Sequence, residues 1–357
     1  MNVETYQHIN LATAMPDRQF DTLEFSRALY AQTTPSLGFR ATTRAEAEAW
    51  QERLSAQLER LLGGFPSVRC PLRPEVVARR EFRGYTRETI HFQSRENLSV
   101  FAYFLLPREF SRPGPCMICI PGHGRGVDDI VGIREDGGQR EDPDGYQHDF
   151  ALQALRQGFA ALAVEPLGFG HRRDPTARMH GAGATSCQPA AGAALLFDQC
   201  MVGWRVWDVI RSVDYLQTRP EVDPQRIGLM GISGGGTITL FGMALEPRLK
   251  ACLISGYFST FRDSIMSLSH CVDNYIPGIL QYAEMWDVAG LIAPRPLFVE
   301  SGHEDPIFPE AATRYAFEQA GRIWRVWDAA DRLGLEVFEG EHVFSGRQGW
   351  PFLRRWL

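Results

Sequence analysis

R-I-G-L-M-G-I-S-G-G-G-T-I-T-L, residues 226–240, is the stretch that decides the predicted fold. A short apolar segment leads into Gly231-Ile232-Ser233-Gly234-Gly235, and a run of small residues suited to a helix follows. Glycines two residues before and after a serine let strand and helix approach where a β-carbon would clash. In such a strand–turn–helix the serine has a strained backbone that lifts its hydroxyl clear of the sheet. The stretch therefore predicts a nucleophile elbow with Ser233 at its tip.

Two later strands end in segments that carry an acid and a histidine. The strand predicted at Leu297–Glu300 is followed by Asp305, and the strand predicted at Leu335–Phe338 is followed by His342. Because parallel strands bring their carboxyl ends to one edge of a sheet, we expect these side chains to meet Ser233. His342 would accept the serine proton and Asp305 would orient the imidazole. Serine, then acid, then histidine is the order found in α/β hydrolases.

Other side chains compete for these roles. The alternative bases are His303 and His270, and the alternative acids are Asp287 and Glu304. A further alternative is that Ser233 occupies a tight glycine turn and does no chemistry.

The segment P-G-H-G at 121–124 is a second candidate part of the site. It follows Cys116–Ile120, a short and fully apolar run typical of a buried parallel strand. A glycine turn there supplies one backbone donor for an oxyanion, and the residue after the nucleophile supplies the other. We therefore predict that the backbone N–H groups of His123 and Gly234 form an oxyanion hole. The side chain of His123 is a rival candidate for acid–base work.

The chain divides into a helical N-terminal extension, residues 1–75, and a main domain, residues 76–357. Thr43 to Leu62 has apolar residues at helical spacing, and Thr43 with Glu46 fits a capping box. We expect this arm to pack on the main domain, with a role in a homo-oligomer as the alternative. Period-two patterns between Val76 and Leu106 predict antiparallel strands, and strands alternating with helices follow.

Two segments of the main domain are candidates for shaping a substrate pocket. Residues 170–192 are rich in small residues and predict a flexible lid, and residues 256–285 mix polar and aromatic residues as a substrate-lining loop would. Between them, a helix predicted over Leu195–Leu216 carries Arg205 and Asp208, which we expect to form an ion pair.

Composition excludes several classes of function. The net charge of −6 and the absence of a basic cluster argue against a nucleic-acid partner, and no apolar run approaches the roughly 20 residues of a membrane span. No signal peptide is visible at Met1–Thr5, so a cytoplasmic location is expected. The seven cysteines lack framework spacing, which suits reduced thiols. Cys116 and Cys119 match C-x-x-C, but a strand would point them to opposite faces, so we expect core residues there.

No metal ion or organic cofactor is implied by any motif. The nine histidines show no H-E-x-x-H or similar set. The acidic segment 127–145 includes a run that faintly matches a calcium loop, but the closing glutamate of that motif is missing. A solvated loop near the mouth of the site is the preferred interpretation.

Together these motifs resemble the α/β-hydrolase superfamily. The resemblance rests on the elbow, P-G-H-G at 121–124, L-I-A-P-R-P at 291–296, G-x-x-D-x-x-F-P at 302–309 and G-E-H-V-F at 340–344. The chain is similar in particular to the acetyl-xylan-esterase-like and dienelactone-hydrolase-like branch of that superfamily. This branch includes bacterial hydrolases with a helical N-terminal extension. The lead-in D-P-x-R-I-G at 223–228 is also similar to prolyl-oligopeptidase-type peptidases. The resemblance implies a mostly parallel central sheet flanked by helices, with antiparallel N-terminal strands.

The function that this resemblance implies is hydrolysis of a small-molecule carboxylic ester through an acyl-enzyme on Ser233. Dienelactone hydrolases usually have a cysteine nucleophile, so the serine favours ordinary ester hydrolysis. Two alternatives use the same residues: an amidase or peptidase, and a carbon–carbon bond hydrolase of aromatic catabolism. A non-catalytic scaffold with this fold is the alternative from a different class.

Overall fold

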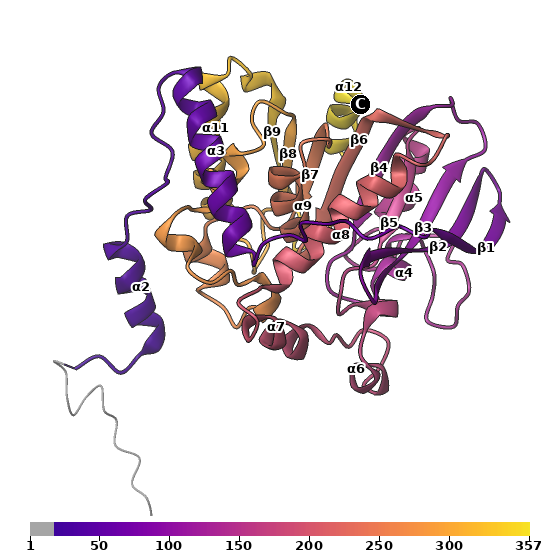
Figure 1. Cartoon of the computed structure of the whole chain (residues 1–357), viewed down its shortest axis with the longest axis horizontal. Helices are drawn as coiled ribbons and strands as arrows, with labels where there is room; N and C mark the ends of the chain where they lie inside the picture. Colours follow the sequence, from indigo (N-terminus) through magenta and orange to yellow (C-terminus); the bar gives the residue numbers. More distant parts are fainter. Residues whose placement is uncertain (1–17) are drawn as a thin grey trace, which may run out of the picture.

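A computed structural model describes residues 18–357 of the chain (Figure 1). The first part of the predicted extension and the signal-peptide prediction at Met1–Thr5 lie outside these residues. None of the helices in the described range is long and apolar enough to cross a membrane.

One sheet of nine strands organises residues 18–357, in the order β1-β2-β3-β5-β4-β6-β7-β8-β9. The strands are β1 (Glu75–Phe82), β2 (Tyr85–Arg95), β3 (Leu98–Pro107), β4 (Gly114–Ile120), β5 (Ala160–Val164), β6 (Val222–Ile232), β7 (Ala251–Ser255), β8 (Leu297–Gly302) and β9 (Leu333–Phe338). Strands β1, β2, β3 and β5 pair antiparallel, and every pair from β5 and β4 through to β9 is parallel. The predicted mostly parallel sheet with antiparallel N-terminal strands is confirmed.

Helices cover both faces of this sheet and bury a separate core on each (Figure 1). One face carries α3 (Arg44–Leu61), α8 (Met201–Leu216), α9 (Gly234–Leu245), α10 (Met285–Gly290) and α11 (Glu310–Val326); the other carries α4 (Val127–Ile130), α5 (Phe150–Arg156) and α12 (Gly349–Trp356). Each strand contributes to both cores because its side chains alternate between the two faces of the sheet. In β4, Cys116 and Ile118 belong to one core and Met117 and Cys119 to the other. The two cysteines of the C-x-x-C match are therefore core residues on opposite faces, as predicted.

The N-terminal helix α3 is built as its sequence indicates. Thr43 caps it through the backbone N–H of Glu46, and the Glu46 carboxylate accepts the N–H of Thr43 in return. Its buried side chains, Trp50 among them, join the core beneath α9 and α11, and the Trp50 indole donates to the carbonyl of Leu37 at 2.6 Å. Helix α2 (Thr22–Gln32), by contrast, buries none of its residues. The predicted extension thus packs on the sheet's helices mainly through α3, and α2 adds a hydrogen bond from the Tyr30 hydroxyl to Glu284 at 3.0 Å.

The segments beside the sheet's carboxyl edge differ in detail from the expected pattern. Residues 170–192 contain η1 (Gly170–Arg172), α6 (Pro175–Met179) and the start of α7 (Cys187–Leu195), and residues 256–285 contain η2 (Phe261–Ile265), η3 (Val272–Asn274) and η4 (Ile279–Gln281). A further short turn, η5 (Ala330–Arg332), precedes β9. The helix expected from Leu195 begins at Met201. A lid role for 170–192 stays a prediction.

The expected ion pair between Arg205 and Asp208 is wrong. Helix α8 is buried on nearly all sides, so each charged side chain meets a partner from another segment. Arg205 lies 2.5 Å from Asp273, and Asp208 accepts a hydrogen bond from Arg172 at 2.6 Å. Spacing along one helix could not reveal these tertiary partners.

Candidate active site

Ser233 occupies the turn between β6 and α9 with φ 57° and ψ −124°. Two close approaches enforce this turn. A β-carbon on Gly235 would lie 2.0 Å from the carbonyl oxygen of Ile120, and one on Gly231 would lie 2.4 Å from the carbonyl oxygen of Gly235. The backbone N–H of Ser233 donates to the carbonyl of Ser255 on β7 at 3.0 Å. The close approach expected at both glycines is confirmed.

His342 and Asp305 lie together beyond the ends of β9 and β8. The Nδ1 atom of His342 is 2.7 Å from Oδ2 of Asp305, and Oδ1 of Asp305 accepts the N–H groups of Ile307 and Phe308 at 2.8 and 3.0 Å. The rings of Tyr146 and Phe308 stack on the His342 ring. The Nε2 atom of His342 is buried and has no hydrogen-bond partner within residues 18–357. One edge of the imidazole is thus fixed, and the other is available to a reacting group.

Ser233 and His342 line one cavity of about 360 Å³. Its other lining residues are His123, Tyr146, Leu268, Ser269, His270, Cys271 and Ile307. Part of the predicted substrate-lining loop, Leu268 to Cys271, therefore forms one wall. Within the described chain, no aspartate or glutamate lines this cavity and no residue of 170–192 does.

The loop after β4 lies against the elbow, and His123 and Ser233 both line this cavity. The amide of Gly234 is the first of α9, where a helix leaves its N–H groups without intrahelical partners. A β-carbon on Gly234 would lie 3.1 Å from Nδ1 of His123, so the two segments are in contact. Residues 146 and 147 fix the position of this loop through two hydrogen bonds. The Tyr146 hydroxyl donates to the carbonyl of His123 at 2.6 Å, and the Gln147 side chain accepts the N–H of Gly122 at 2.8 Å.

Tyr146 is a residue of this site that the sequence did not single out. It lines the cavity with Ser233, and its hydroxyl donates to the His123 carbonyl. Burial raises the pKa of the phenol far above its usual value, so it remains a neutral donor. It lies in an irregular segment before α5, where no spacing marks a functional residue.

The rival candidates occupy other surroundings. His303 is exposed and pairs with Glu310, and Glu304 is exposed. Asp287 is buried on α10, where its carboxylate accepts the N–H of Phe39 at 2.8 Å. His270 lines the cavity, but burial lowers its pKa to about 4. In the described chain, the histidine with an aspartate on its Nδ1 atom in this cavity is His342.

The Nε2 edge of the His123 ring faces a buried carboxylate. Its Nε2 atom lies 3.5 Å from Oδ2 of Asp273. Burial works to lower the pKa of this imidazole, but the nearby Asp273 carboxylate and Cys187 thiol outweigh it and raise the pKa to about 9. An imidazole that keeps its proton at neutral pH is a poor general base.

Known proteins resemble this chain in sequence and in architecture. The chain matches the Abhydrolase family over residues 3–323. YtaP of Bacillus subtilis (strain 168), a proposed hydrolase, is 26% identical over 320 residues, which cover 84% of this chain and 98% of YtaP. BF1801 of Bacteroides fragilis NCTC 9343, a proposed acetyl xylan esterase, superposes with a TM-score of 0.79 at 18% identity over 95% of both chains. A glucuronoyl esterase from Solibacter usitatus superposes with a TM-score of 0.65 at 16% identity over 91% of this chain and 98% of that one.

At 16–18% sequence identity, the superpositions show a shared fold and do not by themselves show a shared function. The sequence match, in contrast, spans most of the chain and includes both the elbow and Asp305. The chain therefore belongs to the Abhydrolase family of α/β hydrolases.

Proposed function

We propose that this protein is a serine hydrolase that cleaves a carboxylic ester through an acyl-enzyme intermediate. The observation that carries the proposal is the arrangement of His342, whose Nδ1 atom is held by Asp305 while its ring lines the cavity that contains Ser233. A serine hydroxyl is a weak nucleophile until a neighbouring base takes its proton. The strained backbone of Ser233, with φ 57° and ψ −124°, supports the same proposal, because backbone strain clusters at active sites.

The steps follow from the proposed roles. Oγ of Ser233 attacks the ester carbonyl as Nε2 of His342 takes its proton, and Asp305 stabilises the imidazolium. The backbone N–H groups of His123 and Gly234 bind the oxyanion, each contributing about 3–4 kcal/mol. The tetrahedral intermediate collapses, and His342 returns the proton to the leaving alcohol. Water activated by His342 then attacks the acyl-enzyme, and the carboxylic acid leaves with Ser233 restored.

The cavity favours an uncharged ester over an amine-bearing substrate. A peptidase that binds a substrate ammonium needs a carboxylate in its pocket, and no lining residue among those described is acidic. The apolar part of the wall comes from Leu268 and Ile307, which suit a short acyl group or a compact ring. The proposed acetyl xylan esterase and the glucuronoyl esterase that superpose on the chain are both esterases, which supports the same bond type. A cytoplasmic location and a homo-oligomer stay predictions from the sequence.

Hydrolysis of p-nitrophenyl esters of increasing acyl length tests this proposal. We expect fast turnover of acetate and propionate esters, falling as the acyl chain outgrows the cavity, and loss of turnover in Ser233→Ala. Ser269→Ala is the matched control, because Ser269 also lines the cavity but lies outside the elbow. Equal turnover in Ser233→Ala and the wild type would contradict the proposal. Turnover of p-nitroanilides in preference to esters would move the assignment to an amidase.

A further inference from the structure

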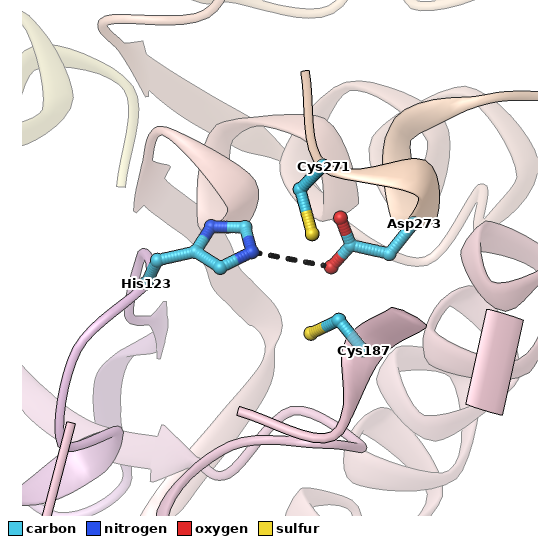
Figure 2. A group of neighbouring side chains, drawn as sticks. All are labelled: His123, Cys187, Cys271 and Asp273. Carbon is cyan, nitrogen blue, oxygen red and sulfur yellow. Dashed lines mark ion pairs between the residues drawn. The ribbon is translucent and has the colours of Figure 1, made fainter. Parts of the chain in front are cut away.

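Beside the proposed active site, four side chains from three distant segments meet at one point. They are His123 in the loop after β4, Cys187 at the first turn of α7, and Cys271 and Asp273 at η3. One atom of each, a ring nitrogen, a sulfur, a sulfur and a carboxylate oxygen, lies within 4.8 Å of the others. Figure 2 shows all four side chains turned toward a common centre. We propose that this cluster is a binding site for a single zinc-type divalent metal ion.

The distances suit a tetrahedral ion. Zinc binds thiolate sulfur at about 2.3 Å and nitrogen or oxygen at about 2.0 Å, so neighbouring ligand atoms lie roughly 3.3–3.8 Å apart. The four donor atoms lie within 4.8 Å of one another, so an ion at their centre would draw the widest-spaced of them closer. The Nε2 atom of His123 fits the role of a ligand, because it is buried, faces Asp273 at 3.5 Å and would give up its proton when the metal binds.

The chemistry of the four donors selects the class of metal. Two thiols and an imidazole are soft or borderline donors, which prefer zinc and its neighbours over magnesium or calcium. All seven cysteines are free, so the two sulfurs are available as thiolates. Four protein donors fill a tetrahedral site and leave no open position, which is the pattern of a structural metal and not of a catalytic one.

Arg205 completes the site from its outer side. This buried guanidinium lies 2.5 Å from Oδ2 of Asp273 and 3.2 Å from Sγ of Cys187, and it also donates to the carbonyl of Leu167 at 2.6 Å. Two thiolates and one carboxylate carry three negative charges, which the two charges of the metal and the one of Arg205 balance. Outer groups of this kind orient metal ligands and tune their affinity. The positive charge of Arg205 is therefore compatible with a cation at the centre.

The position of the cluster gives the metal a role that rests on the proposed function. The backbone of His123 is the proposed oxyanion donor, and Cys271 lines the cavity beside Ser233. One ion would tie the oxyanion loop, the cavity wall and α7 to one another. We infer a positioning site that orders the pocket, while the ester chemistry stays with Ser233.

The test uses full-length, untagged protein that has been treated with chelator and kept reduced. Zinc is then added, unbound metal is removed, and the bound metal is counted by plasma mass spectrometry. We expect one equivalent per chain and a raised Tm. Cobalt(II) in place of zinc should give the intense visible bands of a tetrahedral ion, together with a near-ultraviolet thiolate charge-transfer band.

The variants Cys187→Ser and Cys271→Ser should each weaken zinc binding by about 100-fold or more, since loss of an outer partner alone costs about 10–100-fold. Cys70→Ser is the matched control, because Cys70 is a free, half-buried cysteine outside the cluster. Folding of each variant is checked by circular dichroism, and the cobalt spectrum of the wild type needs no variant.

Absence of stoichiometric zinc in the reduced wild type would overturn the proposal, as would binding that survives both substitutions. A Cys187–Cys271 disulfide found by peptide mass spectrometry in place of bound metal would overturn it too.

These readouts are independent of ester hydrolysis. Metal binding with no esterase activity would refute the proposed function and support the metal site. Esterase activity with no metal binding would support the proposed function and refute the metal site.

Discussion

The carboxylate of Asp305 lies 2.7 Å from Nδ1 of His342, and its other oxygen accepts two backbone N–H groups of the segment that follows. This carboxylate is fully buried, so its position and orientation are fixed by the fold. A histidine held in this way presents Nε2 as its free edge. The relationship leads to predictions on the base, the turn and the loop around them.

Replacing Asp305 with asparagine should lower kcat by about 10³–10⁴-fold and leave KM nearly unchanged. An amide in this position favours the wrong imidazole tautomer while it keeps the geometry. Steady-state kinetics with an ester substrate measure the effect. Asp287→Asn is the control, because Asp287 is also a buried aspartate but contacts Phe39 and α10 instead of a histidine. A larger loss in Asp287→Asn than in Asp305→Asn would contradict the role proposed for Asp305.

Gly235→Ala should destabilise the fold and abolish activity. Its β-carbon would lie 2.0 Å from the carbonyl oxygen of Ile120, a backbone atom that cannot move aside. We expect the free energy of unfolding in urea to fall by about 3 kcal/mol, at the upper end of typical overpacking costs. Gly192→Ala on α7 is the control, since a β-carbon added there would have nothing within 4 Å of it. A Gly235→Ala protein as stable as Gly192→Ala would show that the elbow is not tightly packed.

Tyr146→Phe should lower kcat about 10-fold with little change in KM. The hydroxyl holds the carbonyl of His123 at 2.6 Å, and its loss leaves a buried acceptor unpaired at a cost of about 1–3 kcal/mol. The oxyanion loop would then lose part of its orientation, which acts on the transition state more than on substrate binding. Tyr315→Phe on the half-exposed surface of α11 serves as the comparison. A rise in KM alone would instead make Tyr146 a substrate-binding residue.

The stability of the protein should fall between about pH 5 and pH 7 because of Glu165. Burial raises the pKa of this carboxyl from 4.5 to about 7, although it accepts the N–H groups of His171 and Val127. In this window the unfolded chain has lost the proton and the folded chain still holds it. The folded state therefore binds more protons, and the free energy of unfolding decreases as pH rises.

Glu165→Gln removes this titration, so its unfolding free energy should depend less on pH by about 2–3 kcal/mol across the window. Urea unfolding at pH 5 and pH 7 provides the measurement. The exposed Glu318→Gln variant should follow the wild-type slope, because this side chain meets water in both states. An unchanged slope in Glu165→Gln would show that the pKa of Glu165 does not differ between the folded and the unfolded chain.

Local sequence patterns predicted the parts of the fold that local physics controls. The glycines around Ser233, the capping box of Thr43 and Glu46, and the apolar strand at 116–120 each have one structure that suits them, and each formed. The contact between His342 and Asp305 was also predictable, because parallel strands deliver their ends to one edge.

Tertiary contacts between distant segments were not predictable in this way. Arg205 could reach Asp208 along its helix, yet it pairs with Asp273. Because α8 is buried, both of these side chains pair with an opposite charge from another segment that packs against the helix. The cluster of His123, Cys187, Cys271 and Asp273 spans three segments whose spacing carries no metal motif. Tyr146 likewise comes to line the cavity beside Ser233 from an irregular segment.

Labelling with a fluorophosphonate probe, followed by peptide mass spectrometry, tests the central claim most directly. The probe reacts with a serine only when a neighbouring base activates it. We predict one label per chain, on Ser233, with a labelling rate that falls by about 10³-fold or more in His342→Ala. Labelling of a different residue, or an equal rate in the wild type and His342→Ala, would contradict the proposed roles of Ser233 and His342.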